Sequence, residues 1–144
     1  MTSEAASQTF TIDGELPTLN EYIAAERGNR YAAGRMKRDW TEIVRASAWN
    51  LKPVCQPVTV HCLWVMRNAR KDLDNVRFAM KFILDGLQAA GVLRGDGQRC
   101  VVGLADTFKI DAARPRVEVT ITEAERALGR ADAPADYCTQ EGTR

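Results

Sequence analysis

The sequence predicts a small single-domain α/β protein, in which a mixed β-sheet of about four strands packs against two main helices in the order βαβαββ. Two observations carry this prediction. Short β-branched runs alternate with segments of helical periodicity, and the 144-residue chain has enough apolar residues for one core. We place the domain at residues 8–123 and expect flexible termini at residues 1–7 and 124–144. An apolar fraction of 45% and a charged fraction of 27% exclude a fibrous or disordered chain.

The elements of the first half follow from the hydrophobic pattern. Residues 8–12 alternate polar and apolar side chains, which is a strand pattern, and a turn follows. Residues 15–35 mix Pro17, Gly28 and Gly34 with polar residues and show no sustained period, so we expect an irregular basic loop. From about residue 36 to residue 50 the apolar residues recur at helical spacing, and Pro53 prevents any continuation of this first helix.

The second half begins with a strand and a long helix. Residues 57–66 are rich in β-branched and aromatic side chains, which indicates a central strand. The second helix should start at Asp74 or Asn75 and stop at Gly91. After a glycine-rich loop, two β-patterned runs between residues 100 and 122 should pair with each other as a hairpin.

Basic residues gather in one part of the chain. From Arg27 to Lys71 there are ten basic residues and two acidic ones, although the formal net charge of the whole chain is only +1. Each Lys or Arg that neutralises a phosphate releases condensed counterions, so this excess favours a polyanionic partner. A solvated helix face is the alternative explanation for the same charges.

No segment of the sequence points to secretion or to a membrane. The first residues include Glu4 and lack a basic region followed by an apolar core, and no run approaches the roughly 18 apolar residues of a membrane helix. The four cysteines are widely spaced and form no CxxC pair, which favours reduced thiols. We therefore expect a cytoplasmic protein with no membrane partner.

Three aspartates stand at the ends of predicted elements. Asp72 and Asp74 lie between the central strand and the second helix, and Asp96 lies in the loop after that helix. In an extended chain Asp72 and Asp74 would point to one side, roughly 6.5 Å apart, and share a cation. Mg²⁺ prefers such oxygen ligands and can activate water for attack on phosphorus. Asp96 joins them only if its loop folds back or a second subunit supplies it, whereas capping and turn formation explain the same three residues without any metal.

The segment RKDLDNVRFAMKFILDGLQAAGVLRGDGQ, residues 70–98, resembles the signature of the RusA family of Holliday-junction resolvases. That signature consists of basic residues followed by D-x-D-N, then a lysine-bearing helix that ends in D-A/G-L, and then a loop that ends in D-x-Q. PTLNEY, residues 17–22, is similar to the family's P-P-S-x-N-x-x-Y motif, so the resemblance covers roughly residues 8–123. It implies a RusA-like fold and a homodimer that cuts four-way DNA junctions with Mg²⁺ or Mn²⁺, in recombination and repair or in processing phage or prophage DNA.

The resemblance also implies roles for single residues. Asp72, Asp74 and Asp96 are then the metal-binding acids, and Lys81 is the catalytic lysine. The family has this lysine three residues after its D-N pair, whereas an apparent three-residue insertion precedes Lys81 here, so either Arg77 or Lys81 fills the role. Lys81 follows Asp74 by seven residues, which is two turns of one continuous helix.

The candidates for DNA contact are polar and basic residues near the acidic site or in the expected loop, with phosphates as their main targets. They are Asn20, Arg27, Arg30, Arg35, Lys37, Arg38, Arg67, Arg70, Lys71 and Arg77. Asp85, in the middle of the second helix, is expected to be structural, and Gly95 stands where the family often has a further aspartate. Two alternatives stay open: a catalytically weakened branched-DNA-binding module of the same fold, and a nuclease that acts on flaps or RNA.

Overall fold

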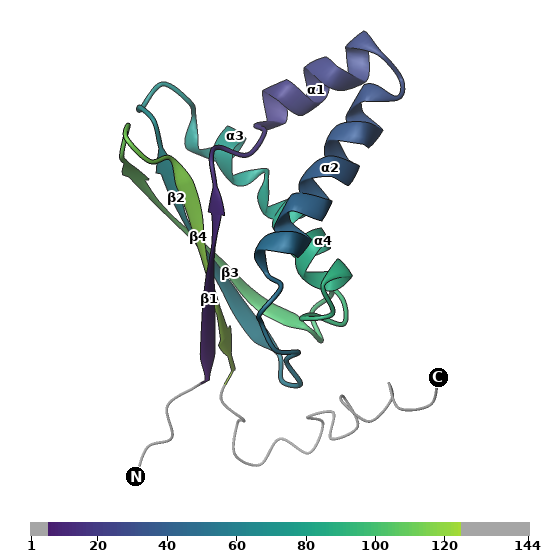
Figure 1. The fold of residues 1–144 in the computed structure, drawn as a ribbon, viewed down its shortest axis with the longest axis vertical. Helices are drawn as coiled ribbons and strands as arrows, with labels where there is room; N and C mark the ends of the chain where they lie inside the picture. The colour runs from purple at the N-terminus through teal and green to yellow at the C-terminus, as the bar shows by residue number, and fades with distance from the viewer. Residues whose placement is uncertain (1–5, 125–144) are drawn as a thin grey trace.

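The computed structural model describes residues 6–124 and has the mixed α/β architecture that the sequence predicts (Figure 1). A four-stranded sheet carries its helices on one face. In chain order the elements are β1 (Ser7–Asp13), α1 (Leu19–Gly28), α2 (Ala32–Ser47), β2 (Val58–Met66), α3 (Leu73–Arg77), α4 (Met80–Ala89), β3 (Val101–Ile110) and β4 (Arg116–Glu123). We expected flexible termini at residues 1–7 and 124–144, and most of these residues lie outside the described part. Of those that are described, Ser7 is the first residue of β1.

The strands have the order β1-β4-β2-β3. β4 pairs antiparallel with β1 and with β2, and β3 pairs parallel with β2. The prediction of a hairpin between the last two strands is therefore wrong, because β2 lies between β3 and β4. The helices α3 and α4 form the crossover that a parallel pair requires. β4 lies between β1 and β2, and its Val117, Val119 and Ile121 are buried in the core.

The core lies between the sheet and the helices α2 and α4. One face of β2 supplies Cys62 and Trp64, and α4 supplies Phe82 and Leu87, all of them buried. Gly86 lets α4 approach α2 closely, because a Cβ at this position would lie 2.4 Å from the Cβ of Val44. These contacts set the direction of α4 relative to the sheet.

The irregular loop expected over residues 15–35 is wrong, since this segment contains α1 and the start of α2. Thr18 caps α1: its Oγ1 accepts a hydrogen bond from the Glu21 N–H at 3.2 Å, and Glu21 Oε1 accepts one from the Thr18 N–H at 2.9 Å. This capping box satisfies two backbone donors that the helix itself leaves unpaired. α1 has no fully buried residue, but its Tyr22 packs against Phe78, with ring centroids 5.3 Å apart.

The long second helix of the prediction is two helices, α3 and α4. Between them the N–H groups of Ala79, Lys81 and Phe82 donate to the carbonyl three residues earlier, at 2.9–3.2 Å. Such bonds tighten the turn relative to an α-helix. Asp74 and Lys81 therefore do not lie on one regular helix, and the expected spacing of two turns along a continuous helix does not apply to them.

Two further features concern the thiols and the helices. Cys62 and Cys100 are free, whereas Cys55 is disulfide-bonded, so the prediction of reduced thiols is wrong at Cys55. The spacing of cysteines along a chain does not show which of them the fold brings together. Within residues 6–124, none of the helices combines the length and the apolar content that crossing a bilayer requires.

Candidate acidic site and nucleic-acid interface

Asp72 and Asp74 lie where the chain leaves β2 and enters α3. Asp72 is the extended N-cap residue of α3, with φ −70° and ψ 144°, and its side chain makes no capping hydrogen bond. Asp74 lies in the first helical turn, where its Oδ1 accepts a hydrogen bond from the Asn75 N–H at 3.0 Å. Both side chains are exposed, and within residues 6–124 neither is in an ion pair. Because Asp74 is helical, the extended geometry expected for the pair is wrong, and the two residues are neighbours only in being two positions apart in the chain.

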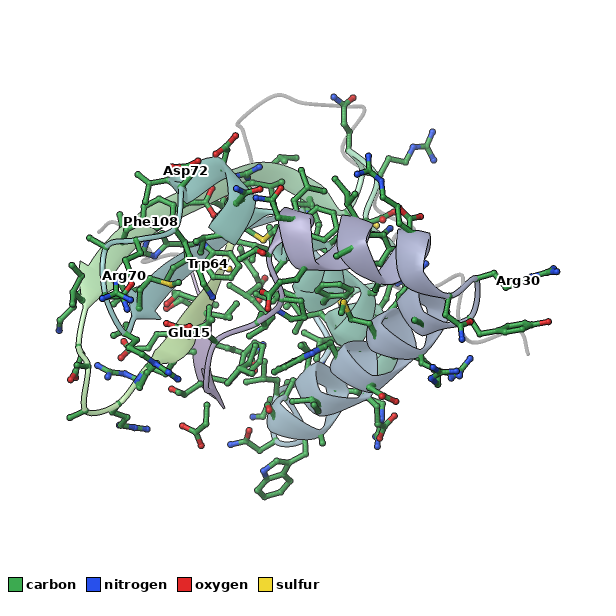
Figure 2. All side chains as sticks on the ribbon, turned by 90° about the horizontal axis from the view of Figure 1, so that it is seen from above. Glu15, Arg30, Trp64, Arg70, Asp72 and Phe108 are labelled. Atoms are coloured by element: carbon green, nitrogen blue, oxygen red, sulfur yellow. The ribbon has the colours of Figure 1, made fainter. Side chains whose placement is uncertain are left out.

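The basic loop that leads into Asp72 is anchored by Glu15, which follows β1. Glu15 Oε2 accepts a hydrogen bond from the Arg67 N–H at 2.7 Å, and Oε1 accepts one from Lys71 Nζ at 3.2 Å. Partial burial favours a higher pKa for Glu15, but the hydrogen bonds from Arg67 and Lys71 and their positive charges outweigh burial and lower the pKa. Figure 2 shows Glu15, Arg70 and Asp72 on the same side of the molecule. An ionised Glu15 therefore holds the loop on which Asp72 depends.

The other end of α3 is anchored by Asp106 on β3. Asp106 Oδ1 accepts a hydrogen bond from Trp64 Nε1 at 2.8 Å, and Oδ2 accepts one from Arg77 Nε at 2.7 Å. Asp106 also stands opposite Cys62 in the parallel register, and burial, followed by the negative charge of Asp106, raises the pKa of the Cys62 thiol. Sequence reasoning missed Asp106, whose only signal is a carboxylate within a run of β-forming residues.

The choice between Arg77 and Lys81 is affected by this anchor. Arg77 is engaged by Asp106, which fixes its guanidinium against the sheet. Lys81 is exposed on α4 and, among the described residues, has no ion-pair partner. Lys81 is thus the one of the two that is available for a ligand. Asp85 lies in the middle of α4, as expected.

Asp96 lies at the opposite end of the sheet. The Val58 N–H, at the start of β2, donates a hydrogen bond to the Cys100 carbonyl at 2.9 Å, so the loop that carries Asp96 lies beside the start of β2. Asp72 instead follows the end of β2, and a nine-residue strand spans roughly 26 Å. Within residues 6–124, no three acidic, histidine or cysteine side chains gather as a metal site. The Asp96 loop therefore does not fold back toward Asp72 and Asp74 in one chain.

The predicted DNA-contact residues form two groups at one end of the molecule. The β2–α3 loop carries Arg67, Arg70 and Lys71. The second group runs from the last turn of α1 through the α1–α2 corner into the first two turns of α2, and comprises Arg27, Arg30, Arg35, Lys37 and Arg38. The α1–α2 corner and the start of α3 both lie at the upper end in Figure 1. Figure 2, seen from above, shows Arg70 and Asp72 on the left and Arg30 on the opposite side, beyond the end of α1. Asn20 is exposed on α1 and precedes both groups in the sequence.

The donor set at the start of α3 suits a hard cation. Mg²⁺ in proteins is held through one or two carboxylates while it keeps several waters and takes phosphate oxygens from its substrate. Asp72 and Asp74 are exposed carboxylates, which is the ligand type that this ion prefers. A site built from all three predicted aspartates does not fit within one chain.

Comparison with known proteins adds no assignment: no family model matches the chain, and no curated protein matches it.

Proposed function

We propose that the chain is a magnesium-dependent endonuclease that cuts branched DNA, with the four-way junction as its substrate. The observation that carries this proposal is the exposed pair Asp72 and Asp74, directly after a basic loop that Glu15 anchors. Carboxylates bind a divalent cation, and neighbouring Lys and Arg side chains bind the phosphates that bring the scissile bond to it. The resemblance of residues 70–98 to the RusA signature supports the same activity.

Mg²⁺ held at Asp72 and Asp74 would supply an activated water for attack on phosphorus and positive charge for the leaving oxygen. The chain's own residues bind and orient the DNA. Arg70 contacts the backbone beside the carboxylates, and Lys81 contacts the strand that is cut, since Lys71 is held by Glu15 and Arg77 is held by Asp106. Contacts to phosphates suit the recognition of shape rather than of base sequence.

We further propose that a homodimer completes the acidic site. β3 is a ten-residue edge strand on which Val102, Leu104 and Ile110 are exposed. An apolar edge strand of this length favours pairing with another chain. Antiparallel pairing with β3 of a second copy would bring the start of one β3 to the end of the other, and so carry Asp96 of the partner subunit toward Asp72 and Asp74.

The activity is tested with a labelled synthetic four-way junction in Mg²⁺, in Mn²⁺ and in EDTA. Asp72→Asn and Asp74→Asn should lower the cleavage rate by about 100-fold or more while junction binding persists, because even supporting partners of metal ligands contribute up to about 100-fold. Asp39→Asn, an exposed carboxylate on α2, is the matched control and should cut like the wild type. Unchanged cleavage by the Asp72 and Asp74 variants contradicts the proposal, and equal cutting of linear duplex indicates a nuclease of another substrate class.

The shared site is tested by mixing two inactive variants, Asp74→Asn and Asp96→Asn. If each site takes carboxylates from both subunits, a mixed dimer retains one intact site, and cleavage should return in the mixture. If each site lies within one chain, the mixture stays inactive and the dimer proposal is wrong.

A catalytically weakened branched-DNA-binding module of the same fold is the second candidate. It is favoured by the position of Asp96, which leaves only two of the three aspartates adjacent within the chain. This candidate requires junction binding without cutting in either metal. Cutting that depends on added Mg²⁺ or Mn²⁺ excludes it.

A further inference from the structure

Tyr31 stands exposed at the corner between α1 and α2, with 62% of its surface accessible. Its backbone is nevertheless held: the Tyr31 N–H donates to Asn29 Oδ1 at 2.9 Å, and the Tyr31 carbonyl accepts from the Arg35 N–H at 3.0 Å. The Arg30 guanidinium lies 5.2 Å from the centroid of the Tyr31 ring. The corner therefore presents an aromatic ring from a fixed backbone, with a cation at the ring.

The charged residues that flank Tyr31 in the sequence are basic. Residues 27–38 contain five basic side chains and no acidic one. None of the five is in an ion pair within the described part of the chain, so their charge is not neutralised there. Such a surface attracts a polyanion, and a cluster of cations beside an exposed aromatic ring is the arrangement by which proteins bind single-stranded nucleic acid.

We propose that Tyr31 is a stacking platform for an unpaired base of DNA, and that residues 27–38 bind the strand around that base. This inference rests on the proposed action on branched DNA and adds what the corner recognises. In a continuous duplex each base is covered by its neighbours, whereas an opened or branched strand offers a free base face. Arg30 occupies a position at the ring from which it adds a cation–π contact to the stack. The corner thus distinguishes opened strands from intact duplex.

The test measures binding in EDTA, where no cutting occurs, by fluorescence anisotropy on a single-stranded oligothymidylate and on a blunt duplex. Tyr31→Leu should weaken single-strand binding about tenfold, which is within the range for loss of one stacked base, and change duplex binding less than twofold. Tyr31→Phe keeps the ring and should bind like the wild type. Trp49→Leu removes another exposed aromatic side chain, just past the far end of α2, and is the matched control with no expected effect.

Several outcomes overturn the proposal: no loss with Tyr31→Leu, an equal loss on duplex and single strand, or a Tyr31→Phe variant as weak as Tyr31→Leu. The phosphate contacts are tested separately with Arg35→Gln. This variant should bind both DNAs more weakly, and the slope of its log affinity against log salt concentration should be smaller in magnitude by about 1. Wild-type protein that binds single strands through Tyr31 but fails to cut junctions in Mg²⁺ refutes the nuclease and leaves this inference standing. If the wild type cuts junctions in Mg²⁺ but Tyr31→Leu binds single strands as tightly as the wild type, the stacking inference is wrong and the nuclease proposal stands.

Discussion

The carboxylate of Asp106 holds α3 on the sheet, and its removal gives the sharpest test of how the site is positioned. Asp106→Ala deletes the acceptor of Trp64 Nε1, which belongs to a side chain only 1% exposed, and the partner of Arg77, whose side chain is 43% exposed. Leaving a buried donor unsatisfied costs about 1–3 kcal/mol. The ion pair to the half-exposed Arg77 adds at most about 1 kcal/mol, because solvent screens it.

We therefore expect Asp106→Ala to lower the free energy of unfolding by about 2–3 kcal/mol, to which the Trp64 donor contributes most. Asp106→Asn keeps an acceptor for Trp64 and loses only the charge opposite Arg77, so its loss should stay near or below about 1 kcal/mol. Urea unfolding followed by circular dichroism measures both values.

A double-mutant cycle with Trp64→Phe isolates the hydrogen bond. In the Trp64→Phe background, Asp106→Ala should cost only the small contribution of Arg77, since no indole donor is left to satisfy. Equal losses for the Ala and Asn variants, or an Asp106→Ala loss that is the same in both backgrounds, would refute this account of Asp106.

Two further predictions concern the loop anchor and the helix packing. Glu15 has a lowered pKa in the fold, so its ionised form stabilises the protein above the ordinary value of 4.5, and this stabilisation is lost as the pH falls through the folded-state pKa. The difference in unfolding free energy between the wild type and Glu15→Gln should therefore shrink below pH 4.5, and a difference independent of pH would contradict the role of the charge. Gly86→Ala places a Cβ 2.4 Å from Val44 Cβ and should destabilise the fold by about 1–3 kcal/mol in thermal unfolding. Gly34→Ala on α2 meets no atom within 4 Å and is the control, expected to be neutral or slightly stabilising.

Local patterns in the sequence were sufficient where one short segment decides its own structure. The alternation of residues 8–12 and the β-branched run of residues 57–66 correspond to β1 and to the interior strand β2. The capping box of Thr18 and Glu21 was also present in the sequence, and it marks the start of α1 that the expected loop overlooked. The weak amphipathic pattern of α1, which buries no residue fully, explains why hydrophobic periodicity did not reveal it.

Long-range packing decided the rest. The position of β4 between β1 and β2 depends on which strands pair with each other across the sheet. The local sequence of a strand does not specify its pairing partners. The same holds for the pairing of Asp106 with Trp64 and Arg77, which join residues 42 and 29 positions apart.

Residue order along the chain was enough to predict the local elements of the candidate site: an aspartate pair between a strand and a helix, preceded by basic residues. Tertiary structure decided which of these residues meet. The crossover through α3 and α4 returns the chain to the start of β2, so Asp96 precedes β3 near the start of β2, whereas Asp72 and Asp74 follow the end of β2. The physical reason is that a helix after a strand runs back along it to begin a parallel neighbour, and this direction separates residues that look adjacent in a motif.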